Sequence, residues 1–281
     1  MNTLLRKLLK EIYDEKQQKV VVLKYYALDW DDNVMFMPTK IYLLTEDGDE
    51  IGMGTEDFAE YRGKLDPKTG KAIKPFDFDG KIIIGLANDA FKDFKSGFSK
   101  FKEDMNNGVE GPSWRDMVES LNTGSYFAII TARGHHPDVL KNAVKTLIDQ
   151  ERGGISKELL TKSLRRRKEK AGLKYTNDSQ EINEYLDECL FYPVSYFYPN
   201  GGVKPEIVKK EAMMLFIDSI KELIDFLNRR NMLKGNNEYR LKPVFGFSDD
   251  DLKNIEFMTS LEGINIYSTH GGTKKLVKKA D

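Results

Sequence analysis

Hydrophobic runs alternate with amphipathic stretches along most of this chain. Val20–Leu28 is β-branched and aromatic, a composition that packs well in a buried parallel strand. Further strands are predicted at 126–130, 192–198, 243–247 and 264–268. Helical spacing of apolar residues predicts helices at 87–105, 114–121, 137–149, 155–171, 177–190 and 206–230, and another ending near 261. Strands and helices in this order predict an α/β fold, with a parallel sheet covered by helices on both faces.

The segment between the first two strands has a mixed pattern. Lys40–Leu44 and Ile51–Gly54 flank an Asp-Gly pair, which is a strong hairpin signal. Thr55 is a candidate N-cap for a short helix after it. Residues 62–81 are rich in Gly, Pro, Lys and Asp and predict a loop. Four phenylalanines at helical spacing favour a core-facing helix side: Phe91, Phe94, Phe98 and Phe101.

The two ends of the chain differ from its middle. Residues 1–18 carry leucines and an isoleucine at helical spacing, between lysines and glutamates. They predict an amphipathic helix that packs on the main domain, with a partner-binding helix as the alternative. The basic tail beyond Gly272 is expected to be frayed.

Composition narrows the class of protein. Lys and Arg total 44 against 45 Asp and Glu, so no overall charge indicates a nucleic-acid coat or a membrane surface. The single cysteine, Cys189, excludes an internal disulfide framework and fits a reducing compartment. No apolar run is long enough to span a membrane, and the first residues lack the flanks of a secretion signal. A cytoplasmic protein without membrane contact is expected, of undetermined oligomeric state.

Polar residues with complementary chemistry follow three of the predicted strands. Asp29-Trp30-Asp31-Asp32 follows the first strand, and its carboxylates repel one another unless a cation lies among them. Thr131 and Arg133 follow the strand at 126–130, and Asp249–Asp251 follow the strand at 243–247. In open α/β sheets, ligands bind beyond the carboxyl ends of the strands. The plainer alternatives are a surface acidic turn at the first site and a helix N-cap at 249–251.

With a lysine, Lys204 or Lys209, before or in the helix at 206–230, these residues run in the order acids, hydroxyl, cation, acids. The order resembles the four motifs of the haloacid dehalogenase-like superfamily of phosphohydrolases, over residues 20–268. The resemblance implies a Rossmann-like core at 19–36 and 122–281, with a cap inserted at 37–121. It also implies a Mg²⁺-dependent phosphomonoesterase that acts through an aspartyl-phosphate intermediate. Its substrate would be a phosphorylated small molecule or a nucleic-acid end.

By this resemblance each motif residue has a role. Asp29 would be the nucleophile, and Asp31, two positions on, the general acid and then the general base. Thr131 would donate its hydroxyl to a phosphoryl oxygen, and a lysine would neutralise the phosphoryl charge. Lys209 is favoured over Lys204 for that lysine. An intact Asp31 favours a phosphatase or phosphotransferase, because transport ATPases of the superfamily carry Thr there and its dehalogenases lack the acid.

The remaining assignments concern metal and substrate. Mg²⁺ would be held by Asp29, by the backbone carbonyl of Asp31 and by a carboxylate of Asp249 or Asp250, with three adjacent aspartates leaving the choice open. Arg133 resembles an arginine at this spacing in polynucleotide 3′-phosphatases and would bind a substrate phosphate, as Lys204 also could. Asn33 departs from the family, which more often has Thr or Val there.

A basic run bears on the substrate class. Arg165–Lys168 forms either a solvated helix face or a contact for phosphate backbones. With Arg133 it favours a nucleotide or polynucleotide 3′-phosphate end as substrate, beside sugar or metabolite phosphates. Two other functions compete with the phosphatase. One is a non-catalytic haloacid dehalogenase-like module, and the other is a phospho-accepting receiver domain.

Overall fold

The computed structural model describes residues 19–199, 203–233 and 239–280. The helix predicted at 1–18 lies outside the described residues. None of the helices within the described ranges is both long and apolar enough to cross a bilayer.

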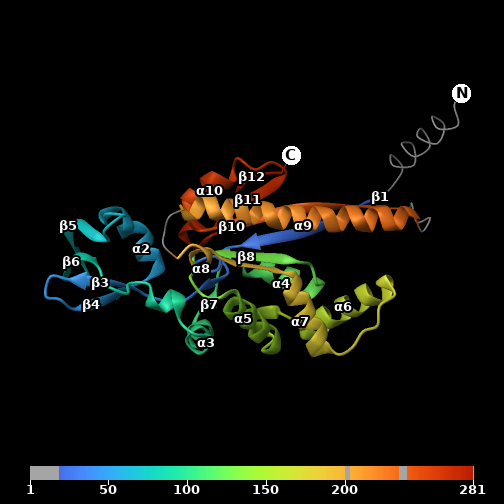
Figure 1. Cartoon of the computed structure of the whole chain (residues 1–281), viewed down its shortest axis with the longest axis horizontal. Coiled ribbons are helices and arrows are strands. Elements are labelled where there is room, and N and C mark those ends of the chain that lie inside the picture. The colour runs from blue at the N-terminus through green and yellow to red at the C-terminus, as the bar shows by residue number, and fades with distance from the viewer. Residues whose placement is uncertain (1–18, 200–202, 234–238, 281) are drawn as a thin grey trace, which may run out of the picture.

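A six-stranded sheet forms the centre of the molecule (Figure 1), in the order β12-β11-β10-β1-β8-β9. Its strands are β1 (Lys19–Leu28), β8 (Phe127–Thr131), β9 (Leu190–Pro193), β10 (Tyr239–Asp249), β11 (Ile264–Ser268) and β12 (Lys275–Lys278). Neighbouring strands are parallel, except that β12 runs antiparallel to β11. The expected α/β class is therefore confirmed, whereas the expected frayed tail is wrong because residues 275–278 pair with β11.

Helices cover both faces of this sheet (Figure 1). The long helix α9 (Pro205–Leu233) and α10 (Leu252–Met258) lie on one face. The other face packs against α3 (Phe98–Asn107), α4 (Trp114–Thr123), α5 (Pro137–Asp149), α6 (Lys157–Ala171) and α7 (Asp178–Glu188). The strand predicted at 192–198 ends at Pro193, where the chain enters the short helix α8 (Val194–Phe197). Proline lacks the N–H group that would continue the ladder.

A second, smaller sheet lies to the left of the core in Figure 1. It has four antiparallel strands in the order β4-β3-β6-β5: β3 (Ile41–Thr45), β4 (Glu50–Met53), β5 (Lys71–Phe78) and β6 (Lys81–Leu86). The predicted hairpin is confirmed as β3 and β4, whereas the loop predicted at 62–81 is wrong because residues 71–78 form β5. The helix α2 (Thr55–Tyr61) follows β4, with Gly54 rather than Thr55 at its N-cap, and the 3₁₀ turn η1 (Arg62–Lys64) follows α2.

This insertion is joined to the core by a two-stranded ribbon of β2 (Met35–Phe36) and β7 (Val109–Glu110). It has its own small core, in which Leu43 and Ile83 are fully buried. The 3₁₀ turn η2 (Lys92–Lys95) and α3 replace the helix predicted at 87–105. Because Phe101 and Met117 are fully buried in the main core, α3 and α4 pack with the large sheet. The separate sheet therefore spans only residues 41–86 of the cap predicted at 37–121.

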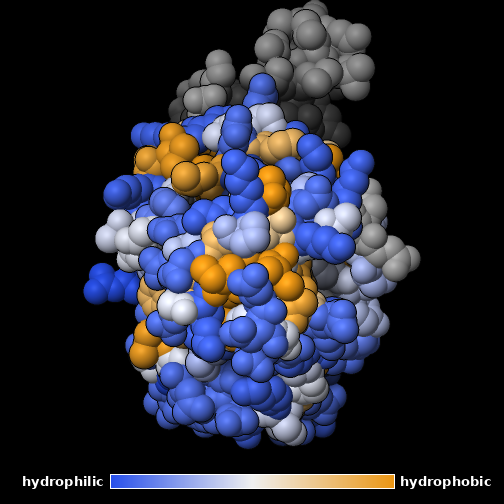
Figure 2. Space-filling model, turned by 90° about the vertical axis from the view of Figure 1, so that its left-hand side faces the viewer, coloured by the Kyte–Doolittle hydropathy of each residue, from blue (hydrophilic) through white to orange (hydrophobic). Residues whose placement is uncertain are grey.

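The outer end of the insertion carries exposed hydrophobic side chains. Ile73 is 65% exposed and Ile82 is 42% exposed. Figure 2 views the molecule from this end and shows hydrophobic groups near the middle of the face, surrounded by hydrophilic ones. Single exposed apolar residues are common on protein surfaces, so these two alone assign no function.

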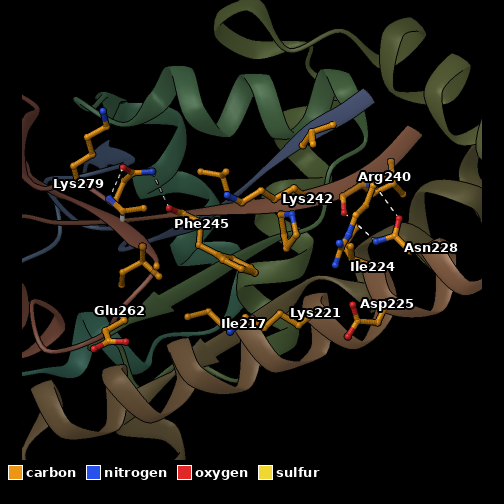
Figure 3. Close-up of a pocket in the computed structure, with 18 residues that line it drawn as sticks. Ile217, Lys221, Ile224, Asp225, Asn228, Arg240, Lys242, Phe245, Glu262 and Lys279 are labelled. Atoms are coloured by element: carbon orange, nitrogen blue, oxygen red, sulfur yellow. Dashed lines mark hydrogen bonds between the residues drawn. The ribbon is translucent and has the colours of Figure 1, made fainter. Parts of the chain in front are cut away.

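A cavity of about 820 Å³ lies between α9 and the amino-terminal half of β10 (Figure 3). β11 pairs with residues 245–249 of β10. Nearer the start of β10, Asn228 of α9 contacts the backbone, donating to the Leu241 carbonyl at 3.0 Å and accepting from the Leu241 N–H at 2.9 Å. The cavity therefore lies beside the amino-terminal half of β10, remote from the carboxyl ends of the strands.

Candidate functional site

Three carboxylates meet at the carboxyl ends of two adjacent strands. Asp29 directly follows β1, Asp249 ends β10, and Asp250 is the next residue. One oxygen atom from each lies within 4.8 Å of the others. Because β1 and β10 are parallel neighbours with Leu28 opposite Ser248, Asp29 is brought beside Asp249. We call Asp29, Asp249 and Asp250 the aspartate triad.

Lys209 lies in the first turns of α9 and points into the triad. Its Nζ atom donates to Asp29 Oδ1 at 2.9 Å and to Asp249 Oδ2 at 2.7 Å. Burial favours the neutral amine, but the two carboxylates outweigh it and raise the pKa of Lys209 well above its usual value. Lys209 is therefore a buried ammonium. Lys204 is exposed at the start of α9 and is not part of this group.

The triad carries more negative charge than Lys209 can balance. Burial raises the pKa of Asp29 to about 7, with Lys209 opposing the rise and Asp249 and Asp31 adding to it. Burial and the neighbouring Asp249 and Asp29 carboxylates raise the pKa of Asp250 to about 9. Burial and the repulsion between neighbouring carboxylates thus both favour the protonated carboxyls, and a divalent cation would favour their charged forms. All the donors are oxygens, which is the ligand set that Mg²⁺ and Ca²⁺ prefer.

The third aspartate of the 249–251 run has a different role. Asp251 is the N-cap of α10 and accepts from the Lys253 N–H. Arg62 of the insertion holds it through two hydrogen bonds of 2.8 and 3.0 Å. The N-cap alternative thus applies to Asp251, which also joins the insertion to the core. Asp249 is oriented by Asn254, whose side chain donates to both of its oxygens.

Asn33 fixes the spacing of the strand ends. Its side-chain nitrogen donates to the Asp29 carbonyl at 2.9 Å and to the Ser248 carbonyl and hydroxyl, both at 3.1 Å. Its side-chain oxygen accepts from Thr269 after β11. The one signal of this role in the sequence is an amide side chain directly after the acidic turn 29–32. Asn33 therefore connects the ends of three strands.

We expect Asn33→Ala to lower the free energy of unfolding by about 2–3 kcal/mol, because the buried Asp29 carbonyl loses its side-chain donor and the Thr269 hydroxyl loses its acceptor, while the Ser248 carbonyl keeps the Asp29 N–H. Chemical denaturation at fixed pH measures this. The control is Asn106→Ala, since the Asn106 amide lies at the surface, where its oxygen accepts from Gln150 Nε2 at 3.3 Å. A loss below about 0.5 kcal/mol, the usual range of surface substitutions, would show that Asn33 does not hold the strand ends together.

Asp31 and Arg133 form a buried pair beside the triad. Arg133 donates from Nε to Asp31 Oδ2 at 2.8 Å and from Nη2 to Asp31 Oδ1 at 2.5 Å, and its guanidinium lies 4.9 Å from the ring centres of Phe94 and Phe101. Nη2 also donates to Thr39. Arg133 is only 1% exposed. In this arrangement its guanidinium binds Asp31, and contact with a substrate phosphate would require that pair to open.

Thr131 ends β8, the neighbour of β1 on the side away from β10. It is buried, and its hydroxyl accepts from the Arg133 N–H at 3.4 Å. Trp30 is fully buried and packs on Phe101, with ring centres 5.5 Å apart, as the alternation of side chains along β1 predicts. The end of β8 thus adds a hydroxyl at the same edge of the sheet as the triad.

The basic run lies elsewhere. On α6, Arg167 donates to the Gly124 carbonyl, which precedes β8 and marks the amino end of the sheet. Lys168 pairs with Glu181 and Glu184 of α7. The run is therefore at the opposite end of the sheet from the triad, and Arg167 and Lys168 form contacts within the protein.

A cavity of about 410 Å³ reaches the triad at Asp250. The insertion contributes α2 and Arg62 to its wall, and the core contributes residues 250–253 and 269–272. We call this cavity the inter-domain cleft. It offers a route by which a small molecule could reach the carboxylates.

Comparisons with protein-family models, with curated proteins and with solved structures each returned no match. We therefore infer the chemistry of the site from its geometry alone. Of the residues singled out in the sequence, five meet at one edge of the sheet: Asp29, Asp249, Asp250, Lys209 and Thr131. Asp31 and Arg133 pair with each other beside them, and Lys204 lies outside.

Proposed function

We propose that this chain is a Mg²⁺-dependent phosphomonoesterase of the haloacid dehalogenase-like type, acting through an aspartyl-phosphate on Asp29. The observation that carries the proposal is the aspartate triad, with the Lys209 ammonium 2.9 Å from Asp29 and 2.7 Å from Asp249. Carboxylates and an ammonium from separate strands and a helix would be costly to bury without a function. Their place at the carboxyl ends of parallel strands agrees with ligand binding there.

The triad supplies the ligands for the ion. Its oxygen donors suit a hard cation, and their excess negative charge would be neutralised by it. When bound, Mg²⁺ would offset the repulsion between the Asp29 carboxylate and the phosphoryl oxygens. Lys209 would stabilise the same oxygens from the other side, with Thr131 donating its hydroxyl.

The reaction divides into two displacements. Asp29 attacks phosphorus, the bond between phosphorus and the ester oxygen breaks, and Asp31 gives that oxygen a proton as the alcohol leaves. Water then attacks the phosphorus of the aspartyl-phosphate and loses its proton to Asp31. Inorganic phosphate leaves and the Asp29 carboxylate is restored. For this role Asp31 must turn away from Arg133, with which it forms an ion pair.

The assay is release of phosphate or nitrophenol from p-nitrophenyl phosphate with Mg²⁺. We expect EDTA to remove the activity and added Mg²⁺ to restore it. Mg²⁺ should also raise the melting temperature of the wild type, and Asp250→Asn should reduce that shift because it removes one ligand of the triad. The control is Asp218→Asn, an exposed aspartate on α9. Activity that is unaffected by EDTA would contradict the proposal.

A non-catalytic module that binds a phosphorylated ligand is the second candidate. The observation in its favour is the Asp31–Arg133 pair, because both carboxylate oxygens of the proposed acid accept hydrogen bonds from Arg133. A Mg²⁺-dependent rise in melting temperature without hydrolysis of any phosphomonoester would support it. A BeF₃⁻ adduct on Asp29 would instead show that this carboxylate can attack phosphorus.

The preference for a nucleotide or polynucleotide end depended on Arg133 and on the 165–168 run. Arg133 is occupied by Asp31, and the run lies at the far end of the sheet. The residues that line the inter-domain cleft are therefore the basis for inferring which class of alcohol forms the substrate ester.

A further inference from the structure

The inter-domain cleft has a strongly acidic wall. Its carboxylates are Asp32, Glu56, Glu60, Asp250 and Asp251, against the two permanent cations Arg62 and Lys253. Arg62 and Asp251 neutralise each other through their two hydrogen bonds. Apart from that pair, four carboxylates face one lysine. A divalent ion at the triad would compensate for Asp250 but not for the carboxylates farther out.

Glu56 and Glu60 both belong to this wall. They stand four residues apart on α2, so their side chains share one face of the helix. Both are exposed and line the cleft, and no hydrogen bond or ion pair to another described residue involves either side chain. They are available to a ligand. Asp250 of the triad lines the same cavity, so a small molecule bound there has the triad and these glutamates in its walls.

We propose that the cleft selects phosphomonoesters of small alcohols that bear an ammonium group. The phosphate would lie at the triad and the ammonium between Glu56 and Glu60. This inference rests on the proposed function and adds the substrate class. A volume of about 410 Å³ suits a small ligand. A polynucleotide end would bring further phosphates against the two glutamates, and like charges disfavour that arrangement.

The test compares three phosphomonoesters of similar size in the full chain with Mg²⁺: phosphoethanolamine, propyl phosphate and 3-phosphopropionate, the phosphate ester of 3-hydroxypropionate. They place an ammonium, a methyl group and a carboxylate at the same distance from phosphorus. We expect the wild type to favour phosphoethanolamine, and 3-phosphopropionate to be the poorest substrate. In Glu56→Lys/Glu60→Lys the ratio of kcat/KM for the ammonium ester to that for the carboxylate ester should fall by about tenfold or more.

The control is Asp57→Lys, which reverses a charge on the same helix without lining the cleft. It should leave the ratio unchanged. Circular dichroism and activity on p-nitrophenyl phosphate show that each variant is folded. Hydrolysis of p-nitrophenyl phosphate with no ammonium preference, or with a ratio that the double variant does not change, would overturn the substrate class and leave the phosphatase proposal standing. Failure to hydrolyse any phosphomonoester would overturn both.

Discussion

Asp29→Asn should lower phosphate release by at least about 10⁴-fold, because removal of a covalent nucleophile typically has effects of that order. The amide has nearly the shape of the carboxylate, and its oxygen can still accept from Lys209 Nζ, which lies 2.9 Å from Asp29 Oδ1. An amide nitrogen or oxygen does not form the aspartyl-phosphate. The loss should therefore appear in kcat while the fold is retained, and steady-state phosphate release measures it.

The stability of this variant provides a second measurement. Burial raises the pKa of Asp29 to about 7, so its charged form is unfavourable in the metal-free protein at pH 8. Replacing it by a neutral amide should leave the metal-free free energy of unfolding at pH 8 equal to or above that of the wild type. Asp218→Asn should change neither activity nor stability. If Asp29→Asn kept a tenth of the activity, Asp29 would not be the nucleophile.

The main sheet could be predicted because its signals are local. Val20–Leu28 is hydrophobic enough to identify a buried strand, and Asp29 directly follows it. The order of strands and helices then places Asp29 and Asp249 at the same edge of the sheet. The structure brings their oxygens within 4.8 Å of each other, with Asp250. The order of the elements and the hydrophobic pattern along the chain were sufficient to place Asp29 and Asp249 at this edge.

Strands β5 and β12 could not be predicted because pairing with distant residues forms them. β5 contains Pro75 and two lysines and is largely exposed, yet Phe76 opposite Ile83 anchors it on β6. β12 has only four residues, and its partner is β11. Their composition resembles that of loops, and only tertiary contacts decide otherwise.

The contacts between charged residues around the site could not be predicted from the sequence either. Arg62 and Asp251 are 189 residues apart in the chain, and Arg133 and Asp31 are 102 apart. The sequence shows a charge at each position but not which charges meet. The prediction that Arg133 contacts substrate depended on its spacing from Thr131 alone, whereas Asp31 and the rings of Phe94 and Phe101 surround it.

Lys209→Met should have the second large effect, because it removes the buried cation and keeps most of the side-chain volume. Breaking a buried ion pair by deleting one partner typically costs about 3–5 kcal/mol. Two carboxylates, Asp29 and Asp249, lose their ammonium at once. We expect a fall of this size in the metal-free free energy of unfolding at pH 8. Phosphate release should fall by about 10³-fold, since the lysine no longer neutralises the phosphoryl oxygens.

The free energy of unfolding of Lys209→Met should depend on pH because Asp29 loses the cation that stabilises its charged form. Without Lys209 the pKa of Asp29, already raised to about 7, moves further above its unfolded value of about 3.9. The folded variant then holds a proton that the unfolded chain has lost, so its stability decreases as pH rises from about 4 through 7. Denaturation at pH 5 and at pH 8 should show a larger loss at pH 8.

Added Mg²⁺ separates the structural role of Lys209 from its chemical role. A divalent cation at the triad supplies the positive charge that Lys209→Met removes, so it should restore part of the lost stability without restoring phosphate release. Lys210→Met is the control, because Lys210 contacts Ser260 at the surface. Equal stability of Lys209→Met and wild type at pH 8 without metal would mean that the triad does not carry the negative charge on which the metal site depends.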